Sequence, residues 1–288
     1  MIDAVIDPFV ELPFMRRALA GCLALSLSAP PIGVFLMLRR MSLMGDAVSH
    51  AVLPGVAIGY LLFGLSPLAM SLGGLVAGLA VALAAGLVAR STLLKEDASL
   101  AGFYLVSLAT GVLIVSLSGS DIDLMHVLFG AALALDGAAL LLVAAIATLS
   151  LIVLAVIYRP LVLECFDPQF LRAASGWSSP THLIFLALVV LNLVAGFQAL
   201  GTLLAVGIMI LPAVTARFWA EDVTGLVLVA IGCAVAASVS GLLLSHYADL
   251  PTGPAIILLS GAVYLLSILL GVRGGLIWNI VPRRHLEA

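Results

Sequence analysis

Charged residues are scarce in this chain of 288 residues: 12 are lysine or arginine and 15 are aspartate or glutamate, 9% of the sequence. A soluble domain carries about a quarter charged residues. Because 64% of the residues are hydrophobic, the chain has too few polar side chains to cover itself with a water-facing surface. Lipid must therefore be its main solvent. No basic stripe of the kind that binds nucleic acid is present, which excludes that partner class.

Several catalytic and structural signatures are also missing. The three cysteines, Cys22, Cys165 and Cys233, form no CxxC and predict neither a disulfide framework nor a thiolate metal site. The single lysine, Lys95, follows Leu94, so the phosphate loop GxxxxGK[ST] is absent and the chain cannot hydrolyse ATP by that route. The absence of HExxH and GxSxG argues against an intramembrane metalloprotease and a rhomboid-like serine protease.

Long apolar runs, in contrast, are abundant. A membrane-spanning helix needs about 20 mainly apolar residues, and runs of that kind predict an all-α, polytopic membrane helix bundle with about nine spans in one domain, 1–288. The boundary at Gly201 is the weakest, because residues 196–211 hold no charge, and one long kinked helix there would reduce the count to eight. The expected spans lie near 17–38, 47–64, 67–89, 99–119, 133–157, 181–199, 201–218, 224–246 and 254–272.

Small residues recur at helical spacing inside two of these runs. Gly55 and Gly59 are four residues apart, and Gly74 and Gly78 repeat this small-xxx-small pattern beside Gly73. Glycine at this spacing lets two helix backbones approach closely. We therefore interpret these positions as helix-packing contacts.

The basic residues predict an orientation. With nine spans and the N-terminus outside, ten basic residues fall on the inner side and two, Arg16 and Arg17, on the outer side, a clear positive-inside bias. The C-terminus is then expected in the cytoplasm. The inner residues are Arg39, Arg40, Arg90, Lys95, Arg159, Arg172, Arg217, Arg273, Arg283 and Arg284.

Ionisable residues inside a bilayer are costly and point to function. Asp46 and His50 are i and i+4, so on a helix both side chains project from one face, and Pro54 leaves the His50 carbonyl without its helical donor. A carboxylate, an imidazole and a freed carbonyl in one turn suit Zn, Mn or Fe better than Ca or Mg. The alternative is structural: Asp46 caps the second span and His50 donates to a neighbouring helix.

Two further Asp/His pairs lie at expected outer ends. Asp123 and His126 are i and i+3 in an outer loop, and His246 and Asp249 repeat that spacing at the end of the eighth span. The spacing favours a plain capped loop or turn at both places, and a metal approach site is the alternative. His182 lies at an expected cytoplasmic edge, as does His285, and we expect both to be solvated.

One expected cytoplasmic stretch, 158–180, is too long to be a turn. Asp167 followed by Pro168 is a good helix start and Gly176 a good stop, which predicts a short amphipathic helix there. Such a helix offers a surface for a partner to push against, and the alternative is a connector lying on the membrane.

The run from Leu38 to Gly55, LRRMSLMGDAVSHAVLPG, closely resembles the permease subunits of bacterial zinc/manganese/iron ABC importers. The likeness extends along most of the chain. Residues 123–130 resemble the outer-loop segment of that family, 166–176 its ATPase-docking segment, and 201–204 with 211–216 its seventh span.

The resemblance implies a transport permease, not an enzyme, in the bacterial cytoplasmic (inner) membrane. Its implied partners are a second copy of the chain, two copies of a cytoplasmic ABC ATPase that hydrolyses ATP, and a periplasmic metal-binding protein. It implies that Asp46 and His50 line the metal path and that coupling to the ATPase involves Glu164, Asp167, Arg172 and Gly176. No permanently bound cofactor is expected, and the transported ion is expected to be zinc first and manganese second, with a manganese/iron importer as the alternative.

Two other classes stay open. In a proton-coupled secondary transporter, Asp46 and His50 would relay protons, and the chain would transport metal under a proton gradient without an ATPase. A non-transporting membrane scaffold would keep full metal uptake when both residues are replaced by alanine.

Overall fold

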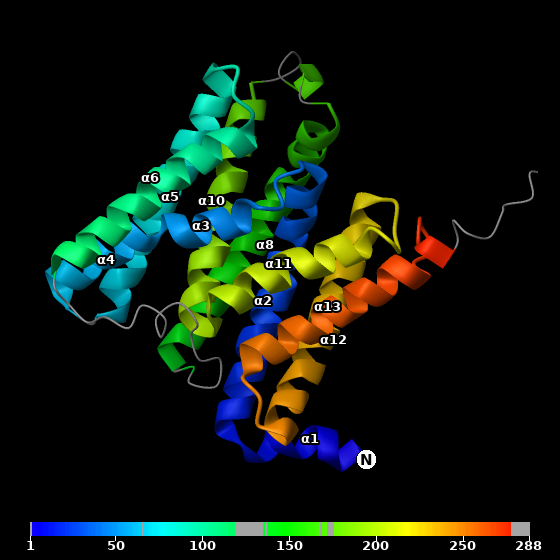
Figure 1. The fold of residues 1–288 in the computed structure, drawn as a ribbon. Helices are drawn as coiled ribbons and strands as arrows, with labels where there is room; N and C mark the ends of the chain where they lie inside the picture. Colours follow the sequence, from blue (N-terminus) through cyan, green and yellow to red (C-terminus); the bar gives the residue numbers. More distant parts are fainter. Residues whose placement is uncertain are drawn as a thin grey trace, which may run out of the picture.

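The computed structural model of the chain describes residues 2–64, 66–118, 135, 137–167, 169–171 and 176–277 (Figure 1). Within these ranges the regular structure is entirely helical. Figure 1 places α4, α5 and α6 on one side of the bundle and α12 and α13 on the other, with α2, α8 and α10 between them. The helices are α1 (Ile2–Glu11), α2 (Pro13–Leu38), α3 (Met44–Ala51), α4 (Leu53–Phe63), α5 (Pro67–Ser91), α6 (Glu96–Ser118), α8 (Gly137–Phe166), α10 (Ser178–Leu200), α11 (Thr202–Ala216), α12 (Val223–Ala248) and α13 (Thr252–Leu270).

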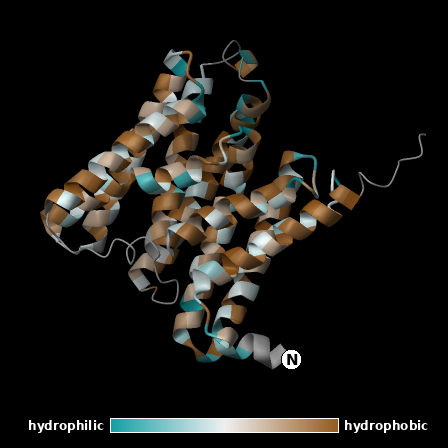
Figure 2. Ribbon diagram, viewed as in Figure 1, coloured by the Kyte–Doolittle hydropathy of each residue, from teal (hydrophilic) through white to brown (hydrophobic). Residues whose placement is uncertain are grey.

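Eight helical segments in the described residues are long and apolar enough to cross a membrane. Figure 2 shows their hydrophobic character along most of their length, with hydrophilic residues gathered toward the ends. The expected seventh span, 201–218, is α11, which has 15 residues and is shorter than these eight segments. It is separate from α10 because Gly201 adopts φ 93° and ψ 157°, which ends the helix. The expected polytopic all-α bundle is confirmed, and the single kinked helix at Gly201 is not formed.

The core of the bundle is built around α2 and α10. In each of these helices 72% of the most apolar 18-residue stretch is buried, compared with 17% of the corresponding stretch in α6 and 22% in α13. Phe35 of α2 and Phe185 of α10 meet edge to face with ring centroids 6.3 Å apart. The peripheral helices therefore direct their apolar side chains outward, as expected for surfaces that face lipid.

Close helix packing at the glycines is confirmed. A Cβ atom built on Gly55 of α4 would lie 2.0 Å from the carbonyl oxygen of Gly73 of α5, and one on Gly73 would lie 2.1 Å from the Gly55 oxygen. A Cβ on Gly59, one turn further along α4, would lie 2.6 Å from the Ala69 oxygen. At these positions the two backbones touch, which only glycine permits.

The expected second span consists of two helices, α3 and α4, which meet at Val52. Before them, α2 closes with two backbone bonds, Met41 N–H to the Leu36 oxygen and Arg40 N–H to the Met37 oxygen. Arg40 adopts φ 60°, the left-handed conformation that this type of helix end requires. In Figure 1, α3 leaves this turn at a wide angle to α2 and leads across the bundle toward α4.

The expected end of the fifth span at residue 157 is wrong, because α8 continues through Pro160 to Phe166. Leu161 and Glu164 in this last part are buried, so packing against neighbouring helices offsets the backbone bond that Pro160 cannot make. The expectation that His182 is solvated is also wrong. Its side chain is fully buried in the first part of α10, because the ends of other helices cover it. His285 lies outside the described residues.

Candidate functional site

Asp46 and His50 lie one turn apart on α3 and point away from the rest of the chain. Their closest atoms, Asp46 Oδ1 and His50 Nε2, are 3.8 Å apart, and the side chains are 73% and 47% exposed. The opposite face of α3 is packed into the bundle, where Met44, Val48 and Ala51 are almost completely buried. The sequence therefore holds α3 by its apolar face and presents its carboxylate and imidazole on a surface.

In the described residues, Asp46 does not cap the helix and His50 does not donate to a neighbouring helix, which was the structural alternative for this pair. Leu43, not Asp46, occupies the N-cap position of α3 and makes no side-chain cap bond. Asp46 lies within the first turn, and its backbone oxygen accepts a hydrogen bond from the Ser49 hydroxyl at 2.6 Å. Within the described residues the Asp46 carboxylate and the His50 ring interact with each other alone.

The geometry of the pair suits two ligands of one cation. Ligand atoms about 2.0–2.2 Å from a first-row metal ion lie at most about 4.4 Å apart, and the observed 3.8 Å falls within that limit. Two ligands do not complete a coordination sphere. In the part of the chain that the structure describes, no group of three or more His, Cys, Asp or Glu side chains could hold a metal.

The expected outer pairs have different outcomes. Asp123 and His126 lie outside the described residues. His246 is partly buried near the end of α12, with its ring 5.2 Å from that of Tyr247. Asp249 follows in the left-handed conformation, φ 49°, and its N–H bonds to the Ser245 oxygen. The structure thus shows the helix-ending turn that was one of the two alternatives at this position.

The four expected ATPase-coupling residues are not equivalent. Glu164 is buried in the last turn of α8, where its Oε1 atom accepts a hydrogen bond from Arg90 Nη2 at 2.5 Å. Asp167 is exposed, and its carboxylate accepts the Phe170 N–H at 2.8 Å, as a helix-capping residue does. Gly176 is exposed at the next described turn. Arg172 lies outside the described residues.

Sequence reasoning missed a polar cluster formed by Arg39, Glu96 and His182, in which Arg39 and His182 are buried and Glu96 is 30% exposed. Arg39 Nη2 lies 3.2 Å from Glu96 Oε1 and 2.5 Å from His182 Nδ1, while His182 Nε2 lies 3.6 Å from Glu96 Oε1. Because a guanidinium only donates, His182 Nδ1 accepts, which assigns the proton of the neutral ring to Nε2, on the side of Glu96. A signal was present: Arg39, Glu96 and His182 all flank ends that the charge count assigns to one side of the membrane.

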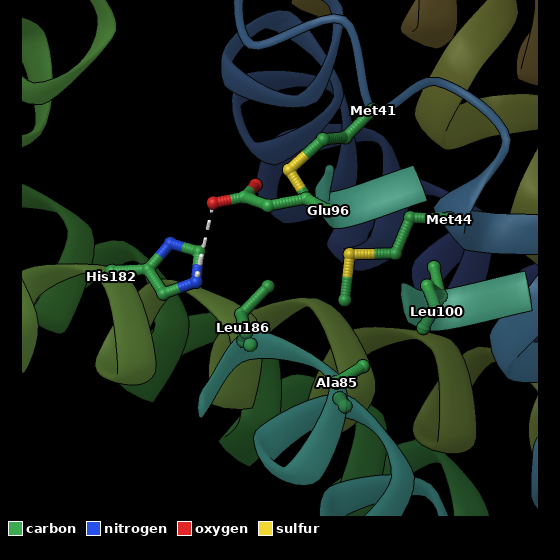
Figure 3. A pocket seen from close by; sticks show the side chains of 9 residues that line it. Met41, Met44, Ala85, Glu96, Leu100, His182 and Leu186 are labelled. Carbon is green, nitrogen blue, oxygen red and sulfur yellow. Dashed lines mark ion pairs between the residues drawn. The ribbon is translucent and has the colours of Figure 1, made fainter. Parts of the chain in front are cut away.

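A small cavity lies beside this cluster (Figure 3). Figure 3 shows the Met41 and Met44 side chains directed into the space near Glu96, His182 and Leu100. Its volume is about 10 Å³, which is room for about one water molecule. Met41 lies in the turn after α2 and Met44 is the first residue of α3. The cavity therefore lies between the start of α3 and the helices α6 and α10.

These features define a class of protein. A bundle of apolar helices with an ionisable pair on a membrane-crossing segment and buried ion pairs at helix ends is a multi-pass membrane protein, and such a pair points to an ion or substrate pathway. The chain matches the ABC 3 transport family over residues 11–271. It belongs to that family of membrane permeases, which confirms the family resemblance, and it is a multi-pass protein of the bacterial cytoplasmic membrane.

The similar proteins agree with this assignment. The chain is 32% identical to the "Manganese import system permease protein ScaB" of Streptococcus parasanguinis over 93% of this chain and 94% of that protein. It is 30% identical to the "Probable iron transport system membrane protein" of Haemophilus influenzae over 93% of this chain and 97% of that protein. The solved structure "PsaBC from Streptococcus pneumoniae in complex with Fab" is 29% identical, with a TM-score of 0.81, over 97% of this chain and 99% of that chain.

Proposed function

We propose that this chain is the permease of an ATP-driven importer of a divalent transition metal, and that Asp46 and His50 are ligands on the metal path. The observation that carries the proposal is the exposure of this pair on α3. An ionisable side chain in the membrane interior costs about 2.5–3.5 kcal/mol on insertion scales. The surface that carries two of them must therefore be covered by protein or line a hydrated path.

A second copy of the chain supplies the missing cover. Two α3 helices facing each other across a two-fold axis bring together two carboxylates and two imidazoles, enough for a four-ligand site. Neither copy holds the site alone, so the ion is released when the two α3 helices separate. This arrangement fits transport, which requires an ion to bind and then to leave.

Manganese or iron is the proposed ion in place of the zinc expected first. Carboxylate oxygen and imidazole nitrogen without thiolate suit Mn and Fe, although they also suit Zn. The names of the similar proteins favour manganese and iron: they are manganese and iron transport proteins. The outer residues Asp123, His126, His246 and Asp249 are then an approach to the site.

The proposed energy source is a separate cytoplasmic ABC ATPase. In this proposal the N-terminus lies outside and the C-terminus lies in the cytoplasm. The similar solved structure carries the name of a two-component assembly, PsaBC, which supports a partner. We place the ATPase on the segment 158–180, which carries three exposed aromatic side chains and the Asp167 cap. They are Phe166, Phe170 and Trp177. The metal arrives from a periplasmic binding protein on the opposite face, and ATP-driven closure of the ATPases alternates access to the two sides.

Metal accumulation tests this function. Cells with the ATPase and the binding protein are expected to accumulate manganese or iron about ten-fold faster with this chain than without it. A catalytically inactive ATPase is expected to abolish the difference, and a protonophore added at constant ATP is not. Uptake by this chain alone under a proton gradient contradicts the proposal in favour of a secondary transporter, and a response to zinc alone overturns the choice of metal.

A second test addresses the docking segment. Replacing both Phe166 and Phe170 by alanine is expected to weaken binding of the ATPase about ten-fold or more, because buried aromatic anchors dominate interfaces. The binding constant is measured with the detergent-purified permease and the isolated ATPase. Phe63→Ala is the matched control, since Phe63 is 70% exposed and Phe166 is 69% exposed, but Phe63 ends α4. Equal binding by the control and the double variant would place the ATPase elsewhere.

A further inference from the structure

The Glu164–Arg90 ion pair joins the ends of three helices. Arg90, in the last turn of α5, donates to Glu164 in the last turn of α8 and also to the hydroxyl and the carbonyl oxygen of Ser178, the first residue of α10. Both charged side chains are almost completely buried, 13% and 3% exposed. The docking segment, 158–180, includes the end of α8 and the start of α10, so through Glu164 and Ser178 the Arg90 side chain ties both of its ends to α5.

The Arg39–Glu96–His182 cluster lies one helical turn further along the same seam. Ser178 and His182 are i and i+4 on α10, so they lie on one face of that helix. On α5, Gly86 and Arg90 have the same spacing, and a Cβ on Gly86 would lie 3.1 Å from His182 Nε2. The α5–α10 seam therefore contacts both polar clusters, one turn apart.

The second cluster holds the entry into α3. Arg39 follows α2 directly, and the backbone bonds of Arg40 and Met41 fix the turn that leads to Met44, the first residue of α3. Met41 and Met44 line the cavity against Glu96 and His182. A displacement of His182 or Glu96 therefore changes the packing at the start of α3. Asp46 lies on this helix, seven residues after Arg39 in the sequence.

We propose that Arg90 and Glu164, with Arg39, Glu96 and His182, are positioning residues that link the docking segment to the metal pair. Movement of the docking segment is carried by the Glu164–Arg90 pair to the α5–α10 seam, and by the Arg39 cluster to α3. The linkage rests on the proposed transport function. Buried ion pairs add little net stability compared with apolar packing. We therefore expect these pairs to fix the positions of the helix ends relative to one another.

The linkage is tested by the amount of metal transported per ATP hydrolysed in the complete transporter, reconstituted in liposomes with its ATPase and binding protein. The neutral pair Arg90→Gln with Glu164→Gln leaves no uncompensated buried charge. It is expected to keep ATP hydrolysis within about two-fold and to lower manganese transported per ATP about ten-fold, within the range of coupling between distant sites. Arg39→Gln with Glu96→Gln is expected to do the same.

The control is another ion pair at helix ends, Arg273 with Glu221, whose side chains are 50% and 65% exposed. Neutralising both is expected to leave the ratio of transport to hydrolysis unchanged. Because the two polar clusters act in series in this proposal, combining both neutral pairs is expected to lower the ratio no further than the stronger one does. Independent structural defects would instead add, and additive losses overturn the linkage.

The other outcomes are also decisive. A neutral pair with the wild-type ratio, or one that lowers hydrolysis and transport in parallel, overturns the linkage. If a neutral pair fails to assemble, Glu164→Asp decides, since it keeps the charge and withdraws it by one methylene. A lowered ratio in Glu164→Asp supports the linkage and an unchanged ratio overturns it. Asp46→Asn and His50→Gln separate the two proposals. Full metal uptake by both variants overturns the proposed function. Lost uptake in these variants, together with neutral pairs that keep the wild-type ratio of transport to hydrolysis, overturns the linkage alone.

Discussion

Replacing Asp46 or His50 by alanine is expected to lower metal uptake at least about ten-fold and to leave assembly with the ATPase intact. Each side chain is one of the two proposed metal ligands on α3, and neither packs in the core, since they are 73% and 47% exposed. Removing one therefore removes a proposed ligand without leaving a cavity, and removes it twice in the proposed two-fold dimer. Uptake is measured with radioactive manganese in cells, and assembly by size-exclusion chromatography of the purified complex.

A matched pair on another helix calibrates this result. His246→Ala and Asp249→Ala change the same residue types at the end of α12, where the structure shows a helix-ending turn. We expect these variants to lose less uptake than the α3 variants, because in the proposed function His246 and Asp249 lie on the approach and are not ligands of the ion. Equal losses at the two places would mean that α3 holds no special site. Full uptake by folded Asp46→Ala and His50→Ala proteins would favour the scaffold class.

Replacing Gly55 or Gly73 by leucine is expected to prevent correct folding of the α4–α5 pair. Even the first added carbon would lie 2.0 or 2.1 Å from a backbone oxygen of the facing helix, so the helices must separate along the whole contact. Overpacking of this kind costs about 1–3 kcal/mol for added methylenes and more when backbone must move. Because α4 continues from α3, we expect lost metal uptake together with lower yield and earlier thermal aggregation.

Alanine at other glycines provides the control. Gly102 of α6 and Gly232 of α12 have nothing within 4 Å of an added Cβ atom. Gly102→Ala and Gly232→Ala are expected to be neutral or to stabilise by up to about 1 kcal/mol, because alanine is the better helix former. The thermal aggregation temperature in one detergent compares all four variants. A Gly55→Leu protein that aggregates at the control temperature would contradict the close contact.

Much of the fold could be predicted because its signal is local. Apolar runs of about 20 residues predict spans directly, since a bilayer demands helices with all backbone bonds satisfied within the segment. The break at Gly201 was uncertain because no charge marks it, and it depends on a backbone conformation, φ 93°, that composition does not report. The extension of α8 through Pro160 was missed because buried packing around Leu161 overrides the local preference of proline.

The candidate site also has features that the sequence predicted and features that it did not. The i, i+4 spacing of Asp46 and His50 was enough to predict a shared helix face, and the structure brings their side chains to 3.8 Å. Glu164 was expected among residues that couple to a partner, yet its carboxylate is buried against Arg90. A residue near a helix end can point outward or inward, and its partner, 74 positions away in sequence, decides which.

By itself, the sequence predicted a polytopic helical membrane protein with a candidate metal-binding pair on its second span, and it showed that the GxxxxGK[ST] phosphate loop is missing. Hydropathy, helical spacing and missing motifs are properties of neighbouring residues, so no tertiary contact was needed. Only the tertiary structure decided that Asp46 and His50 are exposed, that His182 is buried, and that the end of α8 is tied through α5 and α10 toward α3. Those facts depend on which helix ends meet. Apolar helices of similar composition are nearly interchangeable by pattern, and packing shape and paired charges select one arrangement.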